Sequence, residues 1–271
     1  MMNLNSKLFV SMLSILPAVV QADIQPLDDG LLGDVTGQAG ISIDLSAKIK
    51  MGEFRYTDGG SVAIENIVIG GANKQKYFNI DWGPGSHSGD MLDGIKLDID
   101  VANDGDLWIV AKPLPAYGNL VDFGVSTGAW RLMQSSGVSH TALLSSLNFT
   151  GVASELKIRI DESTSVINLQ AGLGIDDLDM EIDFLGIGIE DAVIAGTGYI
   201  ANMEVSSYGL SDLMMPVNLN IYKGNKGLKF DVVQFEADIV MPTINIGGAS
   251  IGGVYVHDLQ LNGSTFEVYG H

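Results

Sequence analysis

The 271-residue chain contains no cysteine, which excludes disulfide frameworks, thiol catalysis and cysteine-ligated zinc. It is also poor in bases, with 14 Lys and Arg against 33 Asp and Glu, and it has no polybasic patch. A surface of this sign repels nucleic acid and anionic lipid headgroups, so we expect neither as a partner. Without disulfides, the fold must be held by its core, by assembly or by ions.

Proline is scarce at 7 residues, whereas glycine is abundant at 34 and follows no collagen-like period. Hydrophobic residues make up 46% of the chain and charged residues only 17%, so this is not a disordered acidic polymer. The length allows one large all-β domain or two smaller ones, and it suffices to bury a core. We expect glycine to serve turns and close approaches of the backbone.

Residues 1–22 have the organisation of a secretory signal peptide. Lys7 supplies a positive start, residues 8–20 form an apolar stretch of the usual length, and small residues precede a predicted cleavage between Ala22 and Asp23. A retained membrane anchor is the alternative, which the short, proline-containing stretch disfavours. Cleavage would leave 33 acids against 13 bases, a net charge of −20. We therefore expect an exported bacterial protein, located in the periplasm, at the outer-membrane surface or outside the cell.

One short pattern recurs through the chain. An apolar residue is followed two places later by Asn or Asp, and then by a brief apolar alternation. Copies occur at 64–71, 189–196 and 256–263, with the polar residue at Asn66, Asp191 and Asp258. Period-2 alternation places apolar side chains on one face, so each copy predicts a β-strand with a polar bend in it. The intervals are unequal and give no solenoid period, although a β-solenoid remains an alternative.

Alternating segments and turn signals fill the rest of the sequence. Turns are predicted at 57–60, 103–106 and 223–227, where Asp, Asn and Gly cluster between apolar runs. A weak helix is expected at 134–147 and a helical turn at 208–214. The fold class is therefore all-β, a glycine-rich antiparallel sandwich or barrel-like domain with at most one or two short helices. Residues 23–40 form a lead-in, and residues 41–271 a single large β domain with a possible subdivision near 134–150.

The lead-in carries a recognisable string. Pro26-Leu27-Asp28-Asp29 is followed by Leu31 and then by Val-Thr-Gly-Gln-Ala-Gly-Ile-Ser-Ile from Val35 to Ile43. Directly after a signal peptide, residues 25–45 resemble the start of proteobacterial secreted surface proteins of the pilus-system FilA type. The resemblance implies a cell-surface or periplasmic address and a filament role, and it supplies no catalytic residues.

The strongest candidate metal site is a turn rich in oxygen ligands. Its candidate calcium ligands are Asp100, Asn103, Asp104 and Asp106. An EF-hand would require helices on both sides and a different spacing, so an ordinary hairpin turn is the competing interpretation. A second carboxylate row alternates along one predicted strand, at Asp177, Asp179, Glu181 and Asp183. We interpret this row as a solvated face whose self-repulsion could attract a weakly bound cation.

Signals for catalysis are weaker. Residues 124–128 match the G-x-S-x-G pattern, but the strand, turn and helix that such a nucleophile elbow needs are not predicted here. His87, His140 and His257 lie far apart in sequence and lack metal-ligand spacing. Paired acids could suggest glycoside hydrolysis, but no aromatic-rich sugar cleft is visible from the spacing. We therefore predict no enzyme and no cofactor other than calcium.

These patterns together favour a non-enzymatic surface protein, associated with filaments or a structural subunit of one. Its expected partners are other copies of itself or pilus and envelope proteins, contacted through the edges of β-strands. An outer-membrane β-barrel is one alternative, although aromatic residues are few at 7% and the last residue is His271. A soluble β module that holds an apolar ligand between its sheets is another, suggested by a mean hydropathy of +0.25.

Overall fold

The computed structural model describes residues 40–81, 89–114, 120–134 and 140–270, and residues 38–271 form one compact unit. Antiparallel strands dominate the described residues, with two short helices, which confirms the all-β prediction. The signal peptide and most of the lead-in lie outside these residues. The strands are β1 (Ile41–Ala47), β2 (Ile49–Asp58), β3 (Gly60–Gly70), β4 (Lys76–Tyr77), β5 (Ile80–Asp81), β6 (Leu92–Val101), β7 (Leu107–Pro113), β8 (Val121–Thr127), β9 (Trp130–Gln134), β10 (His140–Leu144), β11 (Ser146–Ile160), β12 (Ile167–Ile182), β13 (Ile187–Ala195), β14 (Met215–Lys223), β15 (Leu228–Ile246), β16 (Ala249–Gln260) and β17 (Thr265–Val268). The helices are α2 (Tyr199–Asn202) and α3 (Leu210–Leu213).

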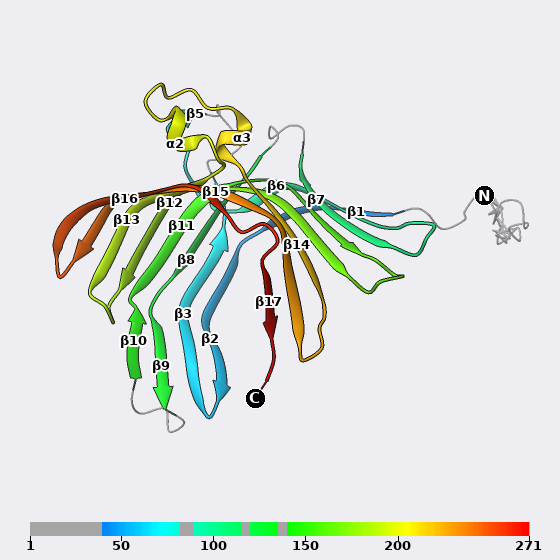
Figure 1. The fold of residues 1–271 in the computed structure, drawn as a ribbon, viewed down its shortest axis with the longest axis horizontal. Helices are drawn as coiled ribbons and strands as arrows, with labels where there is room; N and C mark the ends of the chain where they lie inside the picture. The colour runs from blue at the N-terminus through cyan, green and yellow to red at the C-terminus, as the bar shows by residue number, and fades with distance from the viewer. Residues whose placement is uncertain (1–39, 82–88, 115–119, 135–139, 271) are drawn as a thin grey trace, which may run out of the picture. The chain divides into compact units, whose positions relative to one another are not determined.

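The sheet divides into two halves that share their longest strands. Half-sheet A has the order β1-β6-β7-β11-β12-β14-β15-β17, and half-sheet B the order β2-β3-β8-β11-β12-β13-β15-β16. Every neighbouring pair is antiparallel. Strands β11, β12 and β15 exchange neighbours midway: β12, for example, pairs with β14 up to Leu173 and with β13 from Ile175. Figure 1 shows the strands of the two half-sheets spreading in different directions from this line.

Alternation along the strands gives each half-sheet one apolar face. In half-sheet A, Ile158 of β11 lies opposite Leu169 of β12, and the next residue, Arg159, lies opposite Asn168. In half-sheet B, Phe149 lies opposite Leu178 in the same way. Because period 2 separates the faces, one side of each half-sheet is built from aliphatic and aromatic side chains and the other from polar ones.

A bulge keeps the apolar side continuous from one half-sheet to the other. The register of β11 against β12 shifts between Ala153 and Leu156, so β11 inserts one extra residue at the line where the halves meet. Along β11, the apolar residues have odd numbers in half-sheet B and even numbers in half-sheet A. Without the inserted residue, these two sets of side chains would face opposite sides of the sheet. The bulge therefore changes the strand direction while preserving which side is apolar.

A cluster of buried apolar side chains lies where a cap, formed by the β4–β5 segment, α2 and α3, covers the line at which the half-sheets meet. Residues of the β4–β5 segment, α2 and α3 pack against β11, β13 and β15, as the top of Figure 1 shows. The buried members are Tyr77, Phe78, Leu120, Val152, Ala195, Tyr199, Leu213, Met214 and Val240. The Phe78 and Tyr199 rings meet edge to face at 5.7 Å, and Tyr199 stacks on Tyr208 at 4.9 Å. These aromatic contacts thus hold the cap against the sheet.

All three copies of the recurring pattern contain the predicted polar bend. Asn66, Asp191 and Asp258 have φ values of 51°, 56° and 55°, in the left-handed region that Asn and Asp tolerate better than other side chains. Each lies within a strand; the strand register shifts beside Asp191 and Asp258, whereas β3 keeps its register across Asn66. The predicted turns are also confirmed: Gly59 and Gly105 have positive φ values between β2 and β3 and between β6 and β7.

One secondary-structure prediction is wrong. The helix expected at 134–147 is strand where the structure describes it, with β10 at His140–Leu144 and β11 beginning at Ser146. Ser and Gly residues gave the segment little helix propensity, and pairing of β10 with β9 decides its conformation. The helical turn expected at 208–214 is α3. The possible subdivision near 134–150 does not divide the compact unit.

Gly174 should be intolerant of a side chain, because the cap lies directly on it. A Cβ atom there would lie 2.5 Å from the Leu213 carbonyl oxygen and 2.8 Å from Cζ of Phe78. We expect Gly174→Ala to lower the free energy of unfolding by about 1–3 kcal/mol, measured by urea denaturation. Gly52→Ala is the control, because nothing lies within 4 Å of its Cβ position. Equal stability of the two variants would contradict this account of the cap.

Candidate functional site

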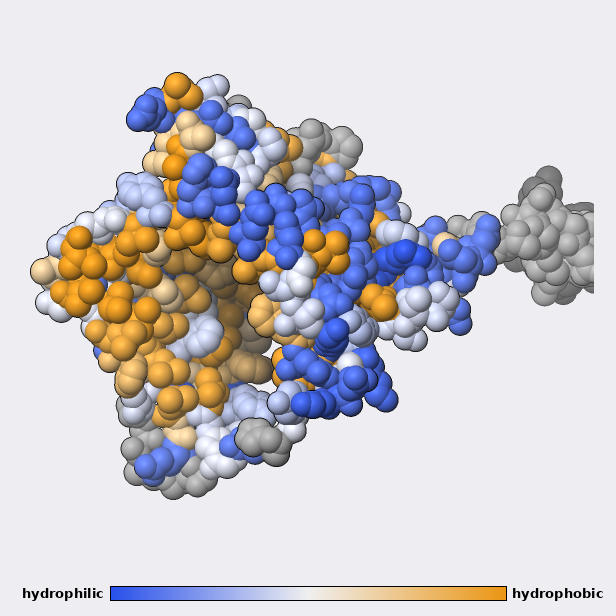
Figure 2. Space-filling model, in the orientation of Figure 1, coloured by the Kyte–Doolittle hydropathy of each residue, from blue (hydrophilic) through white to orange (hydrophobic). Residues whose placement is uncertain are grey.

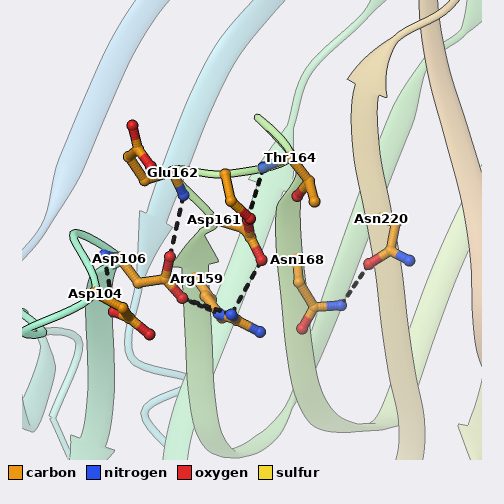
Figure 3. Close-up of polar contacts among 9 residues, drawn as sticks. Asp104, Asp106, Arg159, Asp161, Glu162, Thr164, Asn168 and Asn220 are labelled. Atoms are coloured by element: carbon orange, nitrogen blue, oxygen red, sulfur yellow. Dashed lines mark hydrogen bonds and ion pairs between the residues drawn. The ribbon is translucent and has the colours of Figure 1, made fainter.

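Two of the four predicted calcium ligands, Asp104 and Asp106, lie at the β6–β7 turn, where Arg159 contacts Asp106 (Figure 3). Asp106 is buried, and its Oδ2 accepts a hydrogen bond of 2.6 Å from Nε of Arg159. Its Oδ1 accepts the backbone N–H of Glu162 at 3.1 Å. Oδ1 of Asp104 accepts the backbone N–H of Asp106 at 3.2 Å. These bonds tie the turn to the β11–β12 connection.

This arrangement favours the hairpin interpretation over the calcium one. Arg159 supplies positive charge where a bound cation would have to reach Asp106, and it also lies 3.0 Å from Asp161. Asp100 lies exposed near the end of β6, and Asn103 lies in the turn itself. The calcium site at these residues stays a prediction, and the contacts observed here are those of a structural ion pair.

Local hydrogen bonds also set the charge state of the neighbouring loop. Hydrogen bonds from Ser163 and Thr164 to the carboxylate lower the pKa of Asp161 to about 2, with Arg159 adding to the effect. The Asp161 carboxylate therefore stays negatively charged well into the acidic range. This reinforces the pairing with Arg159.

The structure assembles a different acidic group, on β12 and β13. Carboxylate oxygens of Asp177, Asp179 and Asp191 lie within 4.8 Å of one another. The backbone N–H of Asp191 donates to Oδ1 of Asp179 at 3.0 Å, and Oδ1 of Asp177 is buried without a hydrogen-bond partner among the described residues. Two of these residues belong to the predicted carboxylate row, and the third enters through the bend at Asp191. Oxygen ligands at this spacing are of the kind that hold hard divalent cations.

A cavity of about 360 Å³ lies beside this group, between the cap and the polar side of half-sheet B. Its lining includes Lys74, Asp176 and Tyr199. Nζ of Lys74 lies 2.8 Å from Oδ2 of Asp176 and 3.7 Å from Oδ2 of Asp177, so a lysine already neutralises part of the charge. Burial raises the pKa of Tyr199 to about 12. Burial also raises the pKa of Asp176, and the ion pair with Lys74 opposes that shift.

Replacing Lys74 should therefore make Asp176 harder to ionise. We expect Lys74→Met to raise the pKa of Asp176 further, because burial then acts with less opposition from a nearby positive charge. A carboxyl ¹³C NMR titration measures the shift. Lys76→Met is the control, because Lys76 lines the same cavity but does not approach Asp176 among the described ion pairs. An unchanged or lowered pKa in Lys74→Met would refute the pairing.

A third grouping holds the cap in place. Asp238 is completely buried, and its Oδ2 accepts the backbone N–H groups of Gly198 and Ile200 at 3.2 and 2.9 Å. Its Oδ1 accepts the backbone N–H of Asp258 at 2.9 Å, and His257 Nε2 lies 3.9 Å away. Sequence spacing did not indicate this association, because β15 brings Asp238 beside β16 only in the folded sheet. With three backbone donors on one carboxylate, we assign Asp238 a structural role.

The structure does not bring the remaining residues singled out in the sequence together into a site. Residues 124–128 begin within β8, so Ser126 sits on a straight strand rather than at a sharp turn. Residues 1–39, which include the predicted cleavage between Ala22 and Asp23, lie outside the described part of the chain, and so does His87. Within the described residues, no helix is long and apolar enough to cross a membrane.

Exposed apolar side chains concentrate along the edges of the sheet. Strands β1 and β2 form one edge and β16 and β17 the other, and each pairs on one side only among the described residues. More than half of the exposed large hydrophobic side chains of the described chain lie on these four strands. They are Ile41, Ile43, Leu45, Ile49, Met51, Phe54, Tyr56, Ile251, Val254, Tyr255, Phe266 and Val268. Monomeric proteins rarely leave long edges of this kind uncovered.

Figure 2 shows where apolar surface gathers on one face of the molecule. It covers the region of β12, β13 and β16 and continues into a hollow bordered on the other side by β14 and β17. The hollow is lined by apolar surface, in keeping with the continuous apolar side of the two half-sheets. The protein is thus an all-β chain whose main distinguishing surfaces are two sheet edges and an apolar hollow.

One family model matches this chain. It is described as a family of unknown function (DUF6160), and it matches residues 1–103, from the predicted signal peptide to the turn after β6. The match covers less than half of the chain and includes β1 and β2 but not β16 or β17. No curated protein and no solved structure matches the chain.

Proposed function

We propose that this chain is an exported, non-enzymatic bacterial surface protein that acts as a structural or filament-associated subunit and assembles through its strand edges. The observation that carries the proposal is the concentration of exposed apolar side chains on β1, β2, β16 and β17. The predicted signal peptide and the resemblance of residues 25–45 to pilus-system FilA-type proteins support the surface address.

Edge pairing would satisfy two kinds of group at once. The outer N–H and C=O groups of an edge strand accept a neighbouring strand, and the exposed side chains on the same edge become covered. Phe54, at 53% exposure, and Ile251, at 62%, are examples of side chains that a monomer leaves in water. The net charge of −20 predicted after cleavage opposes association, so we expect added salt to strengthen it by screening.

The backbone of β2 offers a selective way to block its edge. Glu65 of β3 directs its N–H and C=O toward residues 128 and 129, away from β2, and Ala63 shares that orientation. Arg55 lies opposite Ala63, so its own N–H points outward, away from β3. Proline at this position removes an outward donor and no hydrogen bond of the sheet.

We therefore expect Arg55→Pro to weaken self-association roughly tenfold, since it removes one intermolecular hydrogen bond and adds a ring to the edge. Size-exclusion chromatography with light scattering, over a range of concentration and salt, measures the change. Arg55→Ala is the matched control, because it removes the same charge and keeps the N–H group. A wild-type chain that stays monomeric throughout would refute the proposed function.

A second function is favoured by the hollow in Figure 2, namely the binding of an apolar ligand between the half-sheets. Its apolar lining suits an acyl chain. We expect organic extraction of the purified chain, followed by mass spectrometry, to release lipid in near-stoichiometric amount if this function holds. Arg55→Pro should retain that lipid, because Arg55 lies on the polar side of an edge strand. Absence of extractable lipid would leave assembly as the function.

A further inference from the structure

The direction of the edge strands suggests how one copy would meet another. Each half-sheet contains eight strand positions joined by seven antiparallel steps. An odd number of antiparallel steps makes the first and last strands run in opposite directions. Strands β1 and β17 therefore run oppositely in half-sheet A, as do β2 and β16 in half-sheet B.

Both edges also extend across the two half-sheets. Lys48 alone separates β1 from β2, so residues 41–58 form one nearly continuous edge. On the other side, β16 and β17 both pair with β15, which runs through both halves. The two edges are matched in extent in half-sheet B, where β2 has 10 residues and β16 has 12.

The polarity and the extent of the edges lead to a specific arrangement. Resting on the proposed function, we propose that the partner is a second copy of this chain, and that the β1–β2 edge of one copy pairs antiparallel with the β16–β17 edge of the next. A second copy, displaced in the direction in which the strands follow one another, would pair with edge strands of both half-sheets at once. The apolar side then continues from copy to copy without reversal.

Charge favours this pairing over the pairing of two β16–β17 edges. Residues 41–58 carry three bases, at Lys48, Lys50 and Arg55, balanced by three acids. Strands β16 and β17 carry Asp258 and Glu267 and no Lys or Arg. Two β16–β17 edges brought together would oppose four acids without a base, whereas the mixed pairing gives those acids basic neighbours.

A head-to-tail contact of this kind is heterologous, so each added copy leaves a free edge and growth stays open-ended. Neighbouring strands lie about 4.8 Å apart, so eight strands give a repeat of roughly 38 Å per copy. Growth through edge pairing thus predicts a filament with this axial period.

The absence of native cysteine makes the contact testable by crosslinking. Phe54→Cys places a thiol on β2 and Val254→Cys one on β16, both at exposed positions. A flexible bis-maleimide reagent is added to full-length chains carrying either change or both. We expect covalent dimers when the two single variants are mixed, a ladder from the double variant, and little product from either single variant alone.

The possible outcomes separate this inference from the proposed function. Dimers from Phe54→Cys alone, or association by light scattering without any crosslink, would overturn the edge pairing and leave self-assembly standing. A monomer under all conditions would overturn both. Circular dichroism checks that the variants fold. Electron microscopy of the unmodified chain provides an independent measurement, and filaments without a period near 38 Å would contradict the arrangement.

Discussion

Three strands continue without a break across the line where the two half-sheets meet, and the rest of the structure depends on this constraint. Strands β11, β12 and β15 are hydrogen-bonded members of both half-sheets, so the halves share backbone rather than merely packing together. The bulge in β11 between Ala153 and Leu156 lets the chain change direction while its apolar residues stay on one side. The cap, the hollow and the two edges are all placed by these three strands.

The cost of this architecture is a small core. The fully buried apolar cluster sits under the cap, held by aromatic contacts and by the buried carboxylate of Asp238. Much of the apolar side away from the cap is only half-buried, and its outer strands are exposed. Apolar surface left in water favours association or ligand binding, since covering it gains roughly 25 cal/mol per Å². The fold and the proposed assembly are thus linked through the same exposed side chains.

Local patterns in the sequence predicted much of the fold. The left-handed residues at Asn66, Asp191 and Asp258, the hairpin turns and the all-β class follow from alternation and from Asn, Asp and Gly chemistry. The division into half-sheets did not follow, because a bulge such as that near Ala153 has no distinct sequence signal. The contact of Arg159 with Asp106 joins residues far apart in the chain, so the sequence could not show that one of the predicted calcium ligands pairs with an arginine.

The shared strands also determine how the molecule can move. Two domains joined by a linker can swing as rigid bodies, because a few loop residues absorb the rotation. Here any change in the angle between the halves must flex three paired strands together, near Gly174, where a backbone oxygen of the cap already leaves no room for a side chain. The opening of the hollow is therefore mechanically stiff, and force applied along one half is carried directly into the other.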